Sequence, residues 1–361
     1  YLLMMFYTTV AGWMLHYFYL TATGKFVGMD SEQVTGVFSE MLAQPGVMTF
    51  WMVLVVVLGI VICSMGLQNG LERITKVMML ALLGIMVILA INSFTLEGAK
   101  EGLSFYLIPD FEKMVENGIG NVVFGALSQS FFTLSIGIGA MMIFGSYMPK
   151  NRTLAGEAIN ITILDTSVAL MAGFIIIPAC FAFGIEPGAG PSLVFITLPN
   201  IFAQIAGGRI WSALFFLFLF FAALTTIIAV FENLIAIKID LFGWSRKKSV
   251  IVCAAAIIIL SMPAVLGYNV LSGIAPLGEG TTIMDFEDFL VSNNMLPLGS
   301  LVYLLFCVSR YGWGWDNFLK EANTGEGISF PKKLRVYLTF VLPLVVFYIF
   351  IQGYWSLFKS L

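Results

Sequence analysis

Charged residues are scarce in this chain. Only 11% of its 361 residues are Asp, Glu, Lys or Arg, and it contains a single histidine. An ordinary soluble domain carries about 25% charged residues. Hydrophobic residues make up 59% of the chain, and its mean hydropathy is +0.95. So few charges cannot cover the surface of a soluble protein, which excludes soluble, nucleic-acid-binding and disordered proteins. We therefore predict an all-α polytopic membrane protein.

Cysteine is equally sparse, and the four residues Cys63, Cys180, Cys253 and Cys307 lie far apart within or beside apolar runs. This spacing fits neither a disulfide framework nor a metal site. We interpret the cysteines as small packing residues and His16 as a packed or interfacial side chain. The sequence also lacks a nucleophile–base pair and a phosphate-binding loop, which argues against an enzyme.

Long apolar runs are what the chain has in abundance. A membrane-spanning helix needs about 20 mainly apolar residues. This rule predicts nine spans: 1–22, 46–66, 74–95, 121–147, 157–184, 208–240, 249–266, 288–310 and 334–358. The run at 185–207 is too short and too rich in proline and glycine to cross, so we expect a re-entrant or lid element there. Tyr1 already lies in an apolar run without a basic region or cleavage site. We therefore expect hydrophobic sequence ahead of it.

Basic residues are distributed unequally between the two sets of loops. The loops after the second, fourth, sixth and eighth spans hold 13 of the 18: Arg73, Lys76, Lys150, Arg152, Lys238, Arg246, Lys247, Lys248, Arg310, Lys320, Lys332, Lys333 and Arg335. The other side holds the remaining five: Lys25, Lys100, Lys113, Arg209 and Lys359. Because cytoplasmic loops are enriched in Lys and Arg, we expect the first span to run outward and the C-terminus to lie outside the plasma membrane.

The span 121–147 contains an unusual polar stretch, SQSFFTLSIGIGAMM, with Gln129, Thr133 and Ser135 beside several glycines. Glycine weakens a helix, and hydroxyls compete for backbone hydrogen bonds. An unwound backbone at membrane depth is tolerated only where it lines a cavity. The other interpretation is a face of small residues against which another helix packs.

Two further spans carry polar side chains at depth. Asp165 lies well inside 157–184, where a carboxylate costs on the order of 2.5–3.5 kcal/mol and needs a cation, a proton or hydrogen-bond donors. Glu232 lies nearer the cytoplasmic end, where we expect easier hydration. Thr225 and Thr226 follow Ala222 in FFAALTT. Their oxygens suit an alkali cation, although threonines in helices often bond back to their own carbonyls.

Together, SQSFFTLSIGIGA, FITLP and FFAALTT resemble the neurotransmitter:sodium symporter family, and the resemblance covers essentially the whole chain. It implies the LeuT-like inverted-repeat fold. It also implies one transmembrane transporter domain over residues 1–361, truncated at its N-terminus. About nine of a probable eleven helices are then present, and they correspond to the third to the eleventh helix of the family fold. The activity implied is sodium-coupled symport of amino acids across the plasma membrane by alternating access. A chain without the first two helices should not transport, because the family completes its ion sites with the first helix.

The resemblance implies a substrate site as well. Its residues are Leu3, Tyr7, Phe132, Ser135, Ile138, Thr226 and Val230. The Tyr7 hydroxyl matches the group that binds the substrate carboxylate, and Phe132 matches the aromatic lid. Ile138 and Val230 match positions of the side-chain pocket, and both are apolar, which favours an apolar amino acid.

Ion and gate positions are carried over in the same way. The first sodium site matches Thr133 and Asp165, and the second matches Ala222, Thr225 and Thr226. The family usually has asparagine where this chain has Asp165 or a residue within one turn of it. Eukaryotic members bind chloride beside this site, and a carboxylate supplies the same charge. The resemblance therefore implies chloride-independent transport with one or two sodium ions. Gln129 lines the anion position, and the gates match Asp288, Phe132, Tyr147 and Asp240.

Three alternatives stay open. The chain could be an amino acid sensor on the same fold, a proton-coupled amino acid transporter using Asp165, or, least in keeping with its residues, a membrane-embedded enzyme. The sequence leaves open the particular amino acid and the oligomeric state. Its expected partners are the lipid bilayer and a small amino acid, with no nucleic acid.

Overall fold

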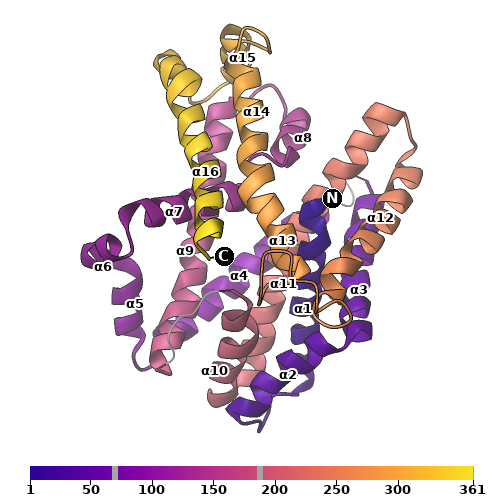
Figure 1. The fold of residues 1–361 in the computed structure, drawn as a ribbon, viewed down its shortest axis with the longest axis vertical. Coiled ribbons are helices and arrows are strands. Elements are labelled where there is room, and N and C mark those ends of the chain that lie inside the picture. The colour runs from indigo at the N-terminus through magenta and orange to yellow at the C-terminus, as the bar shows by residue number, and fades with distance from the viewer. Residues whose placement is uncertain (67–71, 185–189, 361) are drawn as a thin grey trace. The chain divides into compact units, whose positions relative to one another are not determined.

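A computed structural model describes residues 1–66, 72–184 and 190–360 (Figure 1). The described residues are almost entirely helical, and their β-type pairing is limited to one isolated bridge between Arg152 and Glu326. The chain divides into two compact units. Unit 1 comprises Tyr1–Pro109 and Val168–Met284, and unit 2 comprises Asp110–Ser167 and Asp285–Leu361.

Unit 1 is built around one long helix. Its elements are α1 (Leu2–Thr23), α2 (Ser31–Ala43), α3 (Pro45–Ser64), α4 (Arg73–Phe94), α5 (Ala99–Leu107), the second half of α9 (Leu154–Ala182), the π-helical turn η2 (Leu193–Thr197), α10 (Leu198–Gln204), α11 (Gly208–Phe242) and α12 (Arg246–Leu266). Helix α11 packs against α1, α3, α4 and α12. The aromatic side chains of Trp13, Tyr17, Phe195 and Phe216 are buried in its core.

Local sequence signals explain where several of these helices begin and end. Asp30 caps the start of α2 by accepting a hydrogen bond from the Gln33 amide at 2.8 Å. Pro45 begins α3, where its missing N–H costs nothing. Gly24 follows α1 with φ 84°, a left-handed conformation that glycine adopts freely and that ends a helix.

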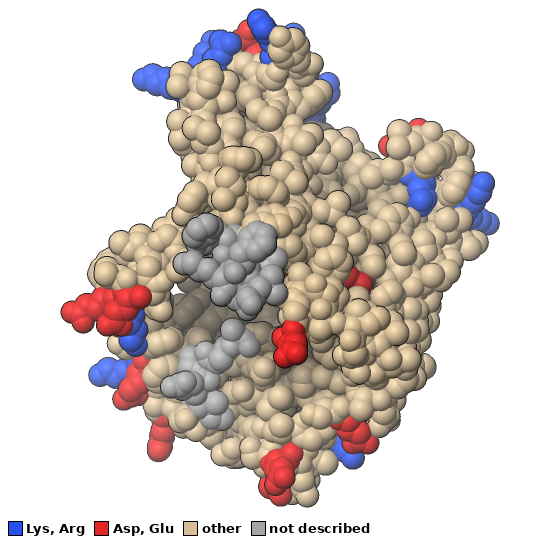
Figure 2. All heavy atoms as spheres, viewed as in Figure 1, with Lys and Arg blue, Asp and Glu red and all other residues tan. Residues whose placement is uncertain are grey.

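Unit 2 contains the broken helix. Its elements are α6 (Phe111–Glu116), α7 (Ile119–Thr133), α8 (Ala140–Tyr147), the first half of α9, most of α13 (Ile283–Phe289), η3 (Leu290–Met295), α14 (Leu296–Val308), α15 (Trp315–Ala322), η4 (Lys332–Leu334), η5 (Tyr337–Val341) and α16 (Leu342–Ser360). Helix α14 packs against α16. On the face drawn in Figure 2, their flanks carry few charges, and basic side chains gather at the end near α15. This pattern fits spans with a basic loop at one end.

Helices occupy all nine predicted spans. Seven are long and apolar enough to cross a membrane among the described residues. The other two differ for physical reasons. Helix α1 has 22 residues but mixes threonines, tyrosines and a histidine into its apolar sequence. The span 121–147 is interrupted, so that neither α7 nor α8 reaches 18 residues.

The described part of the segment 185–207 forms packed helical structure rather than a span. Residues 185–189 lie outside the described part of the chain. Beyond them, η2 and α10 pack against α2 and α11, and bury Phe195, Leu198 and Ile201. The apolar character of FITLP therefore reflects its burial within unit 1. Its role as a lid stays a prediction.

Candidate functional site

The predicted interruption of the span 121–147 is present between Thr133, the last residue of α7, and Ala140, the first of α8. Ser135, Gly137 and Gly139 all have positive φ, at 52°, 90° and 86°. Ser135 is the one non-glycine residue with this conformation in the described chain. Such strained backbone persists only where its surroundings hold it, and it gathers at functional sites.

Close packing within unit 2 holds this unwound segment in place. A Cβ atom added to Gly137 would collide with the carbonyl oxygen of Leu296 on α14. One added to Gly299 would in turn meet the Gly137 carbonyl. The two glycines thus let the unwound backbone lie directly against α14, as small residues do at helix contacts in membranes. Both interpretations of the glycines in this span therefore apply, since they break the helix and also pack.

At the end of α7, the hydroxyl of Thr133 donates to Asp165 on α9. Its Oγ1 lies 2.9 Å from Oδ1 and 3.1 Å from Oδ2 of the carboxylate. Thr133 is exposed and Asp165 is half-buried. A hydroxyl and a carboxylate are hard oxygen ligands of the kind that alkali cations prefer, and they lie here beside an unwound backbone. The structure therefore brings together the two side chains predicted for the first sodium site.

On α11 in unit 1, the oxygens predicted for the second sodium site also converge. Thr225 Oγ1 donates to the Ala222 carbonyl at 2.9 Å, and Thr226 Oγ1 donates to the same oxygen at 3.4 Å. Both hydroxyls therefore bond back to the helix, the local alternative anticipated for them. The Tyr7 side chain, from α1, lies next to Thr226. Two helices thus meet at one group of hydroxyl and carbonyl oxygens.

The other predicted residues are divided between the units. Leu3 on α1 and Val230 on α11 are buried in unit 1. Unit 2 holds Phe132, Ser135 and Ile138 at or after the end of α7, and Gln129 one turn earlier. Their roles stay predictions.

The predicted gate residues lie near helix ends or on exposed surface. Asp240 is exposed close to the end of α11, and Tyr147, the last residue of α8, is 42% exposed. The Asp288 carboxylate accepts a hydrogen bond from Ser292 at 2.8 Å within unit 2. These positions leave the gating roles as predictions.

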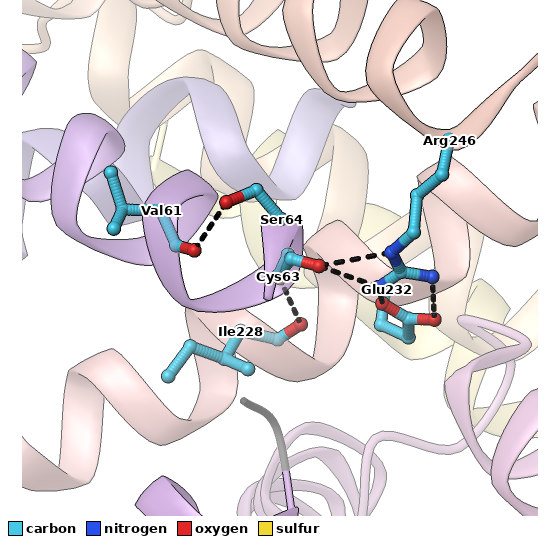
Figure 3. Close-up of polar contacts among 6 residues, drawn as sticks. All are labelled: Val61, Cys63, Ser64, Ile228, Glu232 and Arg246. Atoms are coloured by element: carbon cyan, nitrogen blue, oxygen red, sulfur yellow. Dashed lines mark hydrogen bonds and ion pairs between the residues drawn. The ribbon is translucent and has the colours of Figure 1, made fainter. Parts of the chain in front are cut away.

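The expectation that Glu232 is hydrated is wrong. Its side chain is fully buried and forms a bidentate ion pair with Arg246 at the start of α12 (Figure 3). Arg246 Nη1 lies 3.0 Å from Oε1, and Nη2 lies 2.5 Å from Oε2. A buried carboxylate needs such a partner because the penalty for removing it from water is large. The sequence contains the signal, since Arg246 begins the basic run RKK that opens the next span.

The Arg246 side chain also caps the C-terminal end of α3. Its Nε and Nη2 donate to the Cys63 carbonyl at 3.0 and 2.6 Å, and the Cys63 thiol lies 3.7 Å from the Ile228 carbonyl (Figure 3). Carbonyls in the last turn of a helix have no partner within the helix. Arg246 therefore ties α3, α11 and α12 together at one point.

Comparisons with known proteins place these features in context. Residues 22–360 match the sequence model of the Sodium:neurotransmitter symporter family. The chain is 32% identical over 354 residues to the sodium-dependent transporter YhdH of Bacillus subtilis, covering 98% of this chain and 77% of that one. It is 31% identical over 363 residues to a sodium-dependent transporter of Haemophilus influenzae, covering 97% and 76%. Over 195 residues it is 29% identical to the human sodium- and chloride-dependent creatine transporter 1, covering 50% and 30%.

Among solved structures, the chain is similar to the crystal structure of MhsT in complex with L-phenylalanine. The TM-score is 0.85 at 36% sequence identity, and the match covers 98% of this chain and 78% of MhsT. This likeness confirms the predicted all-α, LeuT-like fold. It also confirms that the three sequence motifs indicate the family correctly.

Proposed function

Because the chain belongs to the sodium:neurotransmitter symporter family, whose members are transporters and not enzymes, we propose that it is a sodium-coupled amino acid symporter. The observation that carries the proposal is the cluster formed by Ala222, Thr225, Thr226 and Tyr7. In it, candidate sodium ligands on α11 adjoin the hydroxyl on α1 that we assign to the substrate carboxylate. Sodium and substrate bound side by side would each raise the affinity for the other, which is the coupling that symport needs.

We assign an apolar amino acid as the substrate. Ile138 and Val230, which we place in the side-chain pocket, are both apolar. The solved relative with 36% identity binds L-phenylalanine. An apolar side chain in such a pocket is held by burial rather than by a specific polar contact.

We further propose that Asp165 removes the need for chloride. A carboxylate beside the first sodium ion supplies one fixed negative charge, which is what a bound chloride would supply. The hydrogen bond from Thr133 orients that carboxylate without neutralising it. In this account the chain uses one or two sodium ions and no anion.

The protein belongs in the plasma membrane, with the C-terminus outside. The support is the excess of basic residues, 13 of the 18, in the loops assigned to the cytoplasm. A membrane potential then drives inward sodium movement at about 2.3 kcal/mol per charge per 100 mV.

The direct test is uptake by the purified full-length protein, expressed from its complete reading frame, in liposomes. We would supply labelled phenylalanine, leucine, tryptophan, tyrosine, alanine and glycine under an inward sodium gradient, with choline in place of sodium as the control. Accumulation above the external concentration, in sodium only, is the expected result. Sodium-dependent binding without accumulation would instead identify a sensor.

A second candidate, proton-coupled transport, is favoured by one observation. The Asp165 carboxylate receives its hydrogen bonds from a neutral hydroxyl, and the described residues contribute no cationic partner to it. Such a group can carry a proton. Uptake that follows an inward proton gradient and ignores sodium would support this candidate.

A further inference from the structure

A cavity in unit 1 lies apart from the predicted sodium, substrate and gate residues. It occupies about 230 Å³ where the end of α1 and its following loop meet α10 and the beginning of α11. A dry cavity of about 150 Å³ is large enough to hold benzene. The space is therefore sufficient for a small organic molecule, and none of its lining residues belongs to the predicted sodium or substrate sites.

Most of the cavity wall is apolar. Phe26 and Val27 contribute from the loop after α1, and Phe202 and Ile205 from α10 and the residue following it. None of the described residues that line the cavity is Asp or Glu. The wall therefore suits an apolar body and offers no counter-ion to an amine.

The basic group of the cavity is Arg209, in the first turn of α11. Its Nε and Nη2 donate to the carbonyl of Ala22 on α1, at 3.0 and 2.6 Å. These two bonds fix the plane of the guanidinium. Its third nitrogen, Nη1, makes no hydrogen bond within the part of the chain that the structure describes. The cavity thus has a positioned positive group with donor capacity left over.

A second polar group, Ser212, lines the same cavity one turn further along α11. It is only 4% exposed, and its hydroxyl has no hydrogen-bond partner among the described residues. Other hydroxyls of unit 1 bond back one turn, as Thr8 does to Met4 and Thr21 to Tyr17. A buried hydroxyl without a partner is unfavourable, and a carboxylate that reached it from the cavity would satisfy it.

The backbone at the start of α11 adds positive charge to the same side of the cavity. Helix α11 has 35 residues and begins at Gly208, which lines the cavity together with Gly207. Among its first amides, the Gly208 N–H donates to the Ile205 carbonyl and the Ile210 N–H to the Gly207 carbonyl, so this end contributes mainly the partial positive charge of a helix N-terminus. Carboxylates bind favourably at such ends.

From these observations we propose that the cavity formed by α1, α10 and α11 is a binding site for a small monocarboxylate with an apolar body. Its carboxylate binds Arg209 and Ser212 at the start of α11, and its apolar part packs against Phe26 and Phe202. Short-chain fatty acids have this chemistry, and so do apolar amino acids bound through their carboxylate alone. The site is separate from the oxygens around Thr226, so its occupation does not need sodium.

The test uses hexanoate as the probe, with the purified protein in nanodiscs and titration calorimetry in sodium-free buffer. Hexylamine and 1-hexanol serve as probes of matched size. Saturable binding of hexanoate, at least tenfold tighter than that of either analogue, is expected. Arg209→Gln is expected to weaken hexanoate binding at least tenfold. Lys25 is a nearby basic residue outside the cavity wall, and Lys25→Gln is expected to weaken hexanoate binding less than twofold. Ser212→Ala is expected to weaken hexanoate binding severalfold. Ser249→Ala removes another buried hydroxyl without a partner among the described residues and is expected to weaken hexanoate binding less than twofold.

Three results would overturn the proposal. They are absence of saturable hexanoate binding, equal binding by the wild type and Arg209→Gln, and equal binding of hexanoate and hexylamine. If Arg209→Gln does not fold, Ala203→Phe fills the cavity from its wall and should abolish hexanoate binding while leaving amino acid uptake in place. Tyr7→Phe separates the two sites, because it is expected to impair uptake and to leave hexanoate binding unchanged.

Discussion

Tyr7 on α1 lies next to Thr226 on α11, the residue that shares the Ala222 carbonyl with Thr225. This contact places the hydroxyl assigned to the substrate one step from the oxygens assigned to sodium. The two helices are close neighbours in unit 1. A change in either group is therefore expected to alter the coupling between the two ligands.

Replacing Tyr7 by Phe tests the assignment of the substrate carboxylate. A hydrogen bond to a charged group contributes about 1.5–3 kcal/mol, so the Kd for the amino acid is expected to rise by about 10- to 150-fold. Sodium binding without amino acid should change less than threefold. Equilibrium binding of labelled amino acid and of sodium-22 measures both. Tyr19→Phe, on the exposed side of the same helix, is the matched control. An unchanged amino acid Kd in Tyr7→Phe would contradict the assignment.

Replacing Asp165 by Asn tests the source of the negative charge. The wild type is expected to transport equally well in chloride and in gluconate. The variant is expected to lose most uptake in gluconate and to recover part of it in chloride, because the anion can replace the missing carboxylate. Asp316→Asn, an exposed acid at the start of α15, should behave as the wild type. Chloride dependence of uptake by the wild type would contradict the proposal that the Asp165 carboxylate replaces a bound chloride.

The ion pair between Glu232 and Arg246 is predicted to stabilise the fold. Arg246→Met leaves a buried carboxylate without its partner, which typically costs about 3–5 kcal/mol. The melting temperature in detergent is expected to fall clearly, whereas Lys247→Met, one residue along and exposed, should leave it nearly unchanged. The double variant Glu232→Gln with Arg246→Met should be more stable than Arg246→Met alone. If it is less stable, the pair does not act as described.

Gly137 is predicted to tolerate no side chain. In Gly137→Ala the new Cβ meets the Leu296 carbonyl, and φ of 90° disfavours any L-residue by about 1–2 kcal/mol. We expect lost uptake and a lower melting temperature. Gly125→Ala on α7 is the control, since its Cβ would enter open space. Wild-type uptake by Gly137→Ala would show that the unwound segment is not held as the structure has it.

Much of the fold could be predicted from the sequence, because apolar runs of about 20 residues leave few alternatives in a membrane. The helix break was predictable for a local reason. Gly137 and Gly139, next to the hydroxyls of Thr133 and Ser135, weaken a helix regardless of what surrounds it. The identity of the family followed from three motifs whose order and length are specific together.

Other features depended on contacts between distant segments. The partner of Glu232 could not be identified from periodicity, because Arg246 lies on another helix and reaches it only after α11 and α12 pack. The same holds for Arg209, whose bonds to Ala22 join residues 187 positions apart. The burial of FITLP against α2 and α11 was not predictable either, because an apolar loop does not reveal which helices cover it.

The proposed symport requires that sodium and an amino acid bind side by side and stabilise each other. The most direct measurement is the Kd of labelled L-phenylalanine as a function of sodium, together with the Kd of sodium-22 as a function of L-phenylalanine, on the purified protein. We expect each ligand to lower the Kd of the other by the same factor, between about 5- and 150-fold. Thr225→Val, which removes one candidate ligand, should reduce both factors together. Tight phenylalanine binding whose Kd does not depend on sodium would show that the two ligands are not coupled in this way.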